Sequence, residues 1–154
     1  MIKKKLYALL LAFVLLAMNV SLVFAAQPLA IHIEVLEYLD FSFNEPFTAS
    51  GPAVDDGIVC PSGTVEDLDI KTKDIPGPYK RLWITKRFYC GDDSGTFDVD
   101  MIVRLHEVTG FTTAHWKVVD GTGDYIKLHG NGKLVGTPFV LWTSILDVYD
   151  GKMH

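Results

Sequence analysis

The sequence is poor in the residues that most often build metal and redox sites. It contains two cysteines, Cys60 and Cys90, and no CxxC pair. No histidine stands at ligand spacing from either cysteine, so we predict no metal site and no cofactor. The four aspartates within residues 92–100 lack the glycine and glutamate positions of an EF-hand, and a solvated hairpin explains them better than calcium.

Positive charge is also scarce. The chain has 14 Lys and Arg against 19 Asp and Glu. Three of the lysines, at 3–5, precede an apolar run over Leu6–Ala17, which is typical of an export signal with cleavage after Ala25. Removing residues 1–25 leaves 11 basic and 19 acidic side chains, a net charge of −8. A chain this acidic is a poor binder of phosphate, so nucleic acid and anionic membranes are unfavourable partners.

The N-terminal signal predicts a secreted or periplasmic protein, with one domain over residues 26–154 and no membrane contact after cleavage. The alternative is an uncleaved anchor, since residues 6–26 are just long enough to span a bilayer. In an oxidising compartment the even cysteine count favours a disulfide between Cys60 and Cys90. Two buried free thiols are the alternative.

No segment after the signal has the period of an amphipathic helix, and the pattern is one of strands. Residues 31–43 alternate apolar and polar, with Glu37 as an exception on the apolar parity. Thr96–Val108 is predicted to be the longest strand. Its odd positions are apolar and its even positions mostly polar, so its orientation decides whether the interior is apolar or ionic.

Glycine and proline turns divide the rest into further short strands, about nine to ten in all. Expected strands include 53–60, 63–70, 125–129 and 139–149, whereas Lys71–Tyr79, with its Pro76–Gly77–Pro78, is expected to be a loop. The fold class is therefore all-β. A closed antiparallel β-barrel is favoured because closure removes exposed strand edges, and a β-sandwich is the alternative.

Three segments carry a family resemblance: SGPAVDDGIVCPSGTVED from Ser50, KRFYCGDDSGTFDVDM from Lys86, and HWKVVDGTGDYIKLHGNGKLVG from His115. They resemble the allene oxide cyclase barrel-like superfamily, which includes dirigent-like proteins, and especially its small exported bacterial members. The most specific part, Trp116–Gly132, is a scaffold of glycines and aromatics.

This resemblance implies an eight-stranded antiparallel barrel around an apolar cavity. In the plant members, the cavity steers a reactive intermediate towards one cyclised or coupled stereoisomer. No catalytic residue of those proteins falls on a matched position here, so the activity is not carried over. Because plant members are often oligomeric, the resemblance also leaves a homo-oligomer open.

Two groups of residues are candidates for chemistry. Asp100, Arg104 and His106 share one parity of a strand, and they could bind an anionic head group or move a proton. The same three residues could equally form a solvated outer face. The second group is aromatic and either lines a ligand pocket or fills the interior. Its members are Trp83, Phe97, Trp116, Tyr125 and Trp142.

The favoured hypothesis is a barrel that binds a small apolar molecule in its interior, and nothing in the sequence identifies an enzyme. One alternative is a cyclase or isomerase that acts by cavity shape, which requires buried polar groups such as Glu37 or Asp98 inside the barrel. Another is a structural or surface-interaction module with a filled interior, in which the segment 71–79 contacts a partner.

Overall fold

The computed structural model of the protein describes residues 27–39 and 44–154. The predicted signal, with its cleavage site after Ala25, lies outside the described residues, as does part of the predicted strand over 31–43. Within the described part of the chain, no helix is long and apolar enough to cross a membrane.

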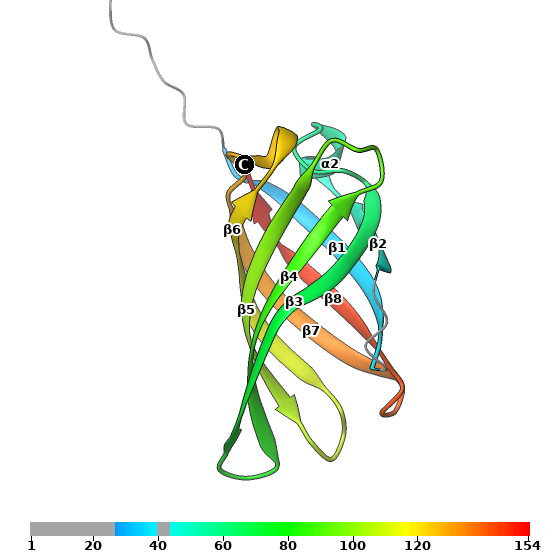
Figure 1. The fold of residues 1–154 in the computed structure, drawn as a ribbon, viewed down its shortest axis with the longest axis vertical. Helices are drawn as coiled ribbons and strands as arrows, with labels where there is room; N and C mark the ends of the chain where they lie inside the picture. The colour runs from blue at the N-terminus through cyan, green and yellow to red at the C-terminus, as the bar shows by residue number, and fades with distance from the viewer. Residues whose placement is uncertain (1–26, 40–43) are drawn as a thin grey trace, which may run out of the picture.

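The fold is a closed barrel of eight antiparallel strands in sequential order, as expected from the alternating pattern (Figure 1). Strand β8 pairs with β1 over ten residue pairs and closes the barrel. The strands are β1 (Leu29–Tyr38), β2 (Glu45–Ser50), β3 (Ser62–Ile75), β4 (Tyr79–Cys90), β5 (Thr96–His106), β6 (Thr112–Gly121), β7 (Gly130–Val140) and β8 (Ser144–Met153).

Three of the predicted strands were wrong, and the loss of the first two explains why eight strands form instead of nine or ten. Residues 53–60 are not a strand, because Pro52 begins the short helix α2 (Pro52–Asp55) and turns follow it. Residues 125–129 are not a strand either, because the 3-10 helix η1 (Gly123–Tyr125) runs into them. The predicted strand 139–149 is divided by a turn at residues 141–143.

The predicted loop 71–79 is mostly strand. β3 continues to Ile75 and β4 begins at Tyr79, so only Pro76–Pro78 turn the chain. This hairpin extends beyond the other strands at the lower end of the barrel in Figure 1. Its residues are largely exposed on both faces, and therefore the sequence there lacks the apolar alternation by which strands are recognised.

The predicted disulfide is present. Cys60, in the segment after α2, is bonded to Cys90 at the end of β4, with a sequence separation of 30. A loop of that length corresponds to roughly 3–4 kcal/mol of stabilisation on the chain-entropy model. The bond ties the segment after α2 to the end of the barrel where α2 and η1 lie (Figure 1). It is consistent with an oxidising compartment.

The odd positions of β5 face the interior, so the interior surface of this strand is apolar. At the end covered by α2 and η1, large buried side chains occupy the barrel interior, and we call this part the closed half. Phe88 and Phe97 stack there with ring centroids 4.8 Å apart, and Tyr149 meets Phe88 edge to face. The main buried residues of the closed half are Ile33, Val35, Phe47, Val65, Phe88, Phe97, Trp116 and Tyr149.

Candidate functional site

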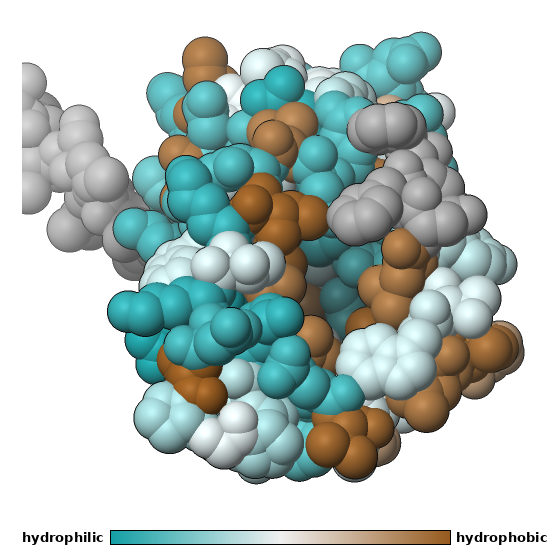
Figure 2. Space-filling model, turned by 60° about the horizontal axis from the view of Figure 1, so that its bottom comes forward, coloured by the Kyte–Doolittle hydropathy of each residue, from teal (hydrophilic) through white to brown (hydrophobic). Residues whose placement is uncertain are grey.

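The other half of the barrel is hollow, and we call it the open half. It contains a cavity of about 550 Å³ that opens between the β3–β4 hairpin and the β7–β8 turn. Figure 2 shows the hollow from this end, bordered by apolar side chains. The walls are mainly apolar and include Leu68, Ile70, Leu82, Ile84, Met101, Val103, Leu105, Pro138 and Ile145.

A β-bulge in β3 shapes one wall of the cavity. The register of β3 against β4 shifts between Asp67 and Asp69, which adds one residue to β3. Before the bulge, Val65 and Asp67 lie on the inward parity, and after it Ile70 and Thr72 line the cavity. The bulge thus places Asp67 at the bottom of the cavity and apolar residues above it.

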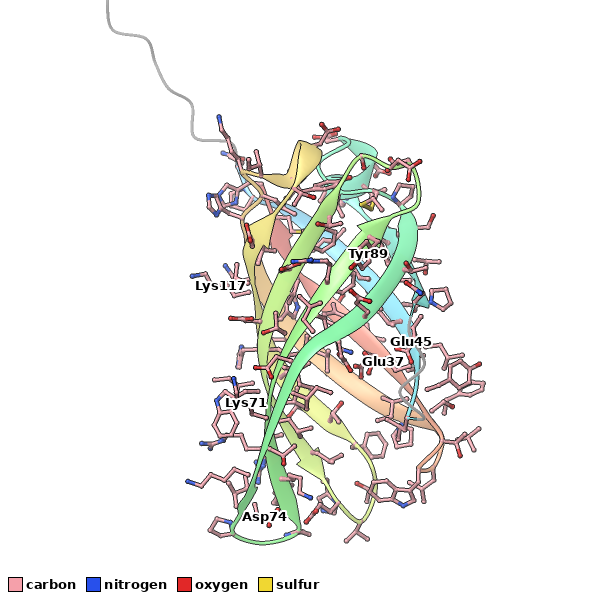
Figure 3. The ribbon with its side chains drawn as sticks, in the orientation of Figure 1. Glu37, Glu45, Lys71, Asp74, Tyr89 and Lys117 are labelled. Carbon is pink, nitrogen blue, oxygen red and sulfur yellow. A yellow bond between two sulfur atoms is a disulfide. The ribbon has the colours of Figure 1, made fainter. Side chains whose placement is uncertain are left out.

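Charged side chains separate the open half from the closed half. We call this group the polar floor: Glu37, Glu45, Asp67, Lys86 and Asp147. Each of Glu37, Lys86 and Asp147 lies on its strand between a cavity-lining residue (Leu39, Ile84, Ile145) and a closed-half residue (Val35, Phe88, Tyr149). Figure 3 labels Glu37 and Glu45, which lie near each other about halfway along the barrel.

Lys86 is the cation of the polar floor and is 2% exposed. Its Nζ lies 2.5 Å from Glu37 Oε1 and 2.7 Å from Asp67 Oδ1, and Asp67 is its direct partner in the β3–β4 register. Burial lowers the pKa of a lysine, but here the attraction of Glu37 and Asp67 outweighs burial and raises the pKa of Lys86. Lys86 therefore stays charged inside the barrel.

Two carboxyl groups of the floor titrate abnormally. Burial raises the pKa of Glu45 to about 7, opposed by the hydrogen bond that the Tyr38 backbone N–H donates to it and supported by the charge of Glu37. Burial, with a further contribution from Glu37, raises the pKa of Asp147 well above its ordinary value. At neutral pH Glu45 is thus close to the midpoint of its titration.

Three buried oxygens next to the floor have no hydrogen-bond partner among residues 27–39 and 44–154: Thr112 Oγ1, Asp147 Oδ1 and the Tyr149 hydroxyl. Thr112 and Asp147 both line the cavity. Unsatisfied buried oxygens are costly, and these have almost no accessible surface, so they make the bottom of the cavity polar without being contact points for a ligand. Within the described ranges, no three His, Cys, Asp or Glu side chains are arranged to hold a metal ion.

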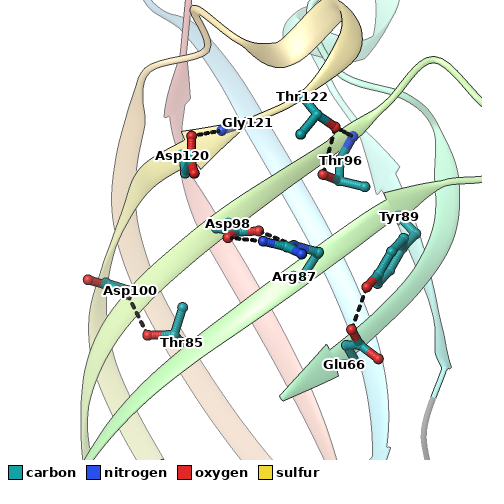
Figure 4. Close-up of polar contacts among 10 residues, drawn as sticks. All are labelled: Glu66, Thr85, Arg87, Tyr89, Thr96, Asp98, Asp100, Asp120, Gly121 and Thr122. Carbon is teal, nitrogen blue, oxygen red and sulfur yellow. Dashed lines mark hydrogen bonds and ion pairs between the residues drawn. The ribbon is translucent and has the colours of Figure 1, made fainter. Parts of the chain in front are cut away.

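The structure places Asp100, Arg104 and His106 on the outer face of β5, away from the cavity. Asp100 accepts a hydrogen bond from the Thr85 hydroxyl (Figure 4), and the Arg104 guanidinium lies 3.7 Å from the centroid of the Tyr79 ring. His106 meets the same tyrosine edge to face. Asp98 also lies outside, where it accepts two hydrogen bonds from Arg87 at 2.7 and 2.8 Å.

The five aromatic candidates are divided between three places. Trp142 lines the mouth of the cavity. Phe97 and Trp116 are buried in the closed half, where Tyr125 packs beside Phe97 and shares a hydrogen bond with Ser94. Trp83 is 36% exposed, and its neighbours Leu82 and Ile84 line the cavity, so it lies on the outer face of β4.

Sequence reasoning noted Glu37 and missed Glu45, Asp67, Lys86 and Asp147. A signal for two of them is present in the sequence, because a charge on the apolar parity of a strand marks a polar interior position. Lys86 stands between Ile84 and Phe88 on that parity, as Asp147 stands between Ile145 and Tyr149. Asp67 carried no such signal. After the bulge the inward residues of β3 stand at even positions, so the next residue on the parity of Asp67 is the polar Asp69 and not an apolar one.

Comparison of the chain with protein-family models, with curated proteins and with solved structures gives no match. The resemblance to the allene oxide cyclase barrel-like superfamily therefore stays a prediction. The cavity and its polar floor are the basis on which a function can be argued.

Proposed function

We propose that this protein binds a small, mostly apolar molecule in the open half of its barrel, with the polar group of that molecule against the polar floor. A volume of about 550 Å³ is within the range of pockets that enclose small ligands, roughly 300–1,000 Å³. Apolar walls with a few polar groups at one end are the usual composition of such pockets.

The observation that carries the proposal is the contrast within one barrel. In the closed half, buried aromatic side chains from facing strands contact one another across the interior. The open half is lined by smaller aliphatic residues and leaves unpartnered oxygens at its bottom. The carboxyl group of Asp67 is 33% exposed at the bottom of the cavity, where it can meet the polar group of a ligand.

Two neighbouring residues of β5 allow a matched test. Val103 lines the cavity and is 4% exposed, whereas Ile102 lies on the outer face and is 54% exposed. We expect the neutral dye N-phenyl-1-naphthylamine to bind the wild-type protein with a rise in fluorescence. Val103→Trp places an indole ring inside the cavity and should weaken that binding strongly, while Ile102→Trp should leave it unchanged. A dye that does not bind, or that binds all three proteins equally, would contradict the proposal.

A second candidate function is an acid–base enzyme of the cyclase or isomerase type. The observation that favours it is Glu45, whose pKa of about 7 suits a general acid or base at neutral pH. The cavity would orient the substrate, and Lys86 would keep the floor polar. A terpene epoxide is a suitable substrate to try. Glu45→Gln should stop its ring opening, and equal turnover in both proteins would exclude this role.

A further inference from the structure

Exposed apolar side chains and a row of cations share the rim of the open half, around the mouth of the cavity. We propose that this rim docks on the surface of a bilayer that contains anionic phospholipid. The inference goes beyond the proposed function, because it identifies an interaction surface and does not depend on what the cavity binds.

The rim is formed by three neighbouring turns at the open end of the barrel: β3–β4, β5–β6 and β7–β8 (Figure 1). The backbone N–H of Glu107, in the β5–β6 turn, donates a hydrogen bond to the carbonyl of Pro78 in the β3–β4 turn at 2.9 Å. On the other side, a Cβ atom added to Gly110 would lie 3.0 Å from Pro138 Cγ and 3.2 Å from Leu141 Cδ1. The three turns therefore form one continuous surface.

The apolar part of the rim, which we call the apolar lip, lies on the β5–β6 and β7–β8 turns. Residues 139–142 are four consecutive large apolar residues, and each is more than half exposed. Exposed runs of this kind mark binding surfaces. Figure 2 shows apolar side chains gathered on one side of the hollow. The lip consists of Val108, Phe111, Phe139, Val140, Leu141 and Trp142.

Trp142 is the third residue of a turn closed by a hydrogen bond of 2.9 Å from the Thr143 N–H to the Val140 carbonyl. Its φ is 61°, in the left-handed region where a turn favours glycine or asparagine. Turn geometry therefore does not explain a tryptophan at this position. Its side chain borders the mouth of the cavity and remains 53% exposed. Tryptophan is well suited to the boundary between lipid and water, because its ring is apolar and its N–H is polar.

The cationic part of the rim is a row of three side chains on neighbouring strands, and we call it the cationic row: Lys73, Arg81 and Arg104. Arg81 pairs with Lys73 in the β3–β4 register and with Arg104 in the β4–β5 register. Each member stands next to a residue that lines the cavity, so all three lie on the outer face. Each is also two residues from the open end of its strand. The row thus borders the mouth of the cavity from outside.

The charges of the cationic row are not compensated within the described structure. The carboxylates of the same hairpins, at positions 69, 74 and 107, pair with Lys71 and Lys80 instead. The three members of the row form no ion pair with a described residue, and Arg104 lies over the Tyr79 ring. Like charges directly opposite each other on a sheet repel. Anions placed beside the row would remove this repulsion, and lipid phosphate groups are such anions.

The net charge of the whole chain predicted no membrane partner, but the charge is unevenly distributed. Residues 69–81 and 104–113 contain five Lys and Arg and three Asp and Glu, which gives +2. The rest of the chain after residue 25 then carries −10, since the total is −8. Most strands have ten or more residues, so the two ends of the barrel are further apart than the Debye length, about 8 Å at physiological salt. An anionic surface is therefore attracted at the open end.

A bilayer satisfies both parts of the rim. The apolar lip enters the boundary between head groups and acyl chains, and the cationic row contacts phosphate groups beside it. A second copy of the chain, docked on the lip by two-fold symmetry, would bring a second cationic row to the same interface. On a bilayer the mouth of the cavity faces lipid, so an apolar molecule can pass between the two without crossing water.

The test is sedimentation of residues 26–154 with vesicles, because the apolar run of the predicted signal would itself bind lipid. We expect the protein to sediment with vesicles of phosphatidylcholine and phosphatidylglycerol in equal parts. Binding to phosphatidylcholine alone should be at least about tenfold weaker. Phe139→Ser should weaken binding to the mixed vesicles at least about tenfold, and Arg81→Gln about fivefold.

Two residues at the closed end supply matched controls. Ile126 is 73% exposed, close to the 69% of Phe139, and Lys127 is an exposed cation like Arg81. Ile126→Ser and Lys127→Gln should bind the mixed vesicles as the wild type does. All four substitutions change exposed side chains, so the fold is retained.

The orientation is tested with brominated phosphatidylcholine in the mixed vesicles. It should quench part of the tryptophan fluorescence of the wild type, and Trp142→Phe should remove that quenching and still sediment. Quenching that persists in this variant would place another face on the lipid and overturn the proposal.

Three results in sedimentation would also overturn it: no binding to the mixed vesicles, equal binding to both kinds of vesicle, or a Phe139→Ser variant that binds like the wild type. If the wild type does not sediment and elutes as a dimer in gel filtration, whereas Phe139→Ser elutes as a monomer, the lip is a contact between copies instead. Dye binding is measured without vesicles, so failure of the docking proposal and failure of the proposed function are separate results.

Discussion

The two halves of this barrel are built from the same eight strands and yet differ in what fills them. Phenylalanine, tryptophan and tyrosine side chains contact one another across the closed half, and the disulfide and two short helical segments cover it. Aliphatic side chains line the open half without meeting at its centre. The difference indicates that stability is concentrated in one half, so that the other can remain hollow.

The first prediction tests where the stability lies. Phe88 is fully buried between Phe47, Phe97 and Tyr149, and Phe88→Ala should lower the free energy of unfolding by about 4 kcal/mol. Leu82, six residues earlier on β4, faces the cavity. Leu82→Ala should cost only about 1 kcal/mol, because that side chain already borders open space. Urea denaturation measures both values, and equal costs would show that the two halves are equally well packed.

The second prediction concerns the boundary between the halves. Lys86→Met leaves Glu37 and Asp67 without their cation, and we expect a loss of about 3 kcal/mol at pH 8. This is at the lower end of the range for a broken buried ion pair, because Asp67 is 33% exposed and water can reach it from the cavity.

Lys80→Met is the control for Lys86. Lys80 pairs with Glu107 and Asp74 on the outside of the barrel, where water screens both charges. Its loss should leave the urea midpoint unchanged. If Lys86→Met is as stable as the wild type, the polar floor is not held together by this lysine.

The fold could be predicted from the sequence much better than the site. Alternation in β5 and glycine at the turns were enough for a closed antiparallel barrel, because these signals are local. The polar floor depends on which residues of five different strands come to the same height, and that is set by register and by the bulge after Asp67. Asp100 and His106 were prominent because polar residues of one strand are easy to notice, yet their parity faces solvent.

The predicted segments show the same limit. The hairpin over 71–79 was expected to be a loop because it has no buried face, although its backbone pairs as regularly as the rest of β3 and β4. The residues 53–60 were expected to be a strand because several of them are apolar. In the structure Ala53, within α2, and Val59, in the segment after it, are buried against the core of the closed half. Apolar residues therefore indicated burial correctly and the type of element wrongly.

The third and smallest effect should come from Glu45, which lies in the floor on the side of the open half. The pKa of Glu45 is about 7 in the folded protein, compared with an ordinary value of 4.5. Between these two pH values the folded state therefore holds a proton that the unfolded state has lost. Unfolding then releases protons, and stability falls as the pH rises through this window, by about 1 kcal/mol once solvent screening through the cavity is allowed for. Asp147 acts in the same direction.

Glu45→Gln keeps an oxygen that can accept the hydrogen bond of the Tyr38 N–H and removes the charge. We expect this variant to be more stable than the wild type at pH 8 and equally stable at pH 4, with a shallower fall between them. Urea denaturation at intervals from pH 4 to pH 8 measures the two curves. Glu107→Gln, which removes a carboxylate outside the barrel, should follow the wild-type curve. If Glu45→Gln follows it too, then Glu45 is hydrated like an outer residue, and the open half is wetter than its apolar walls indicate.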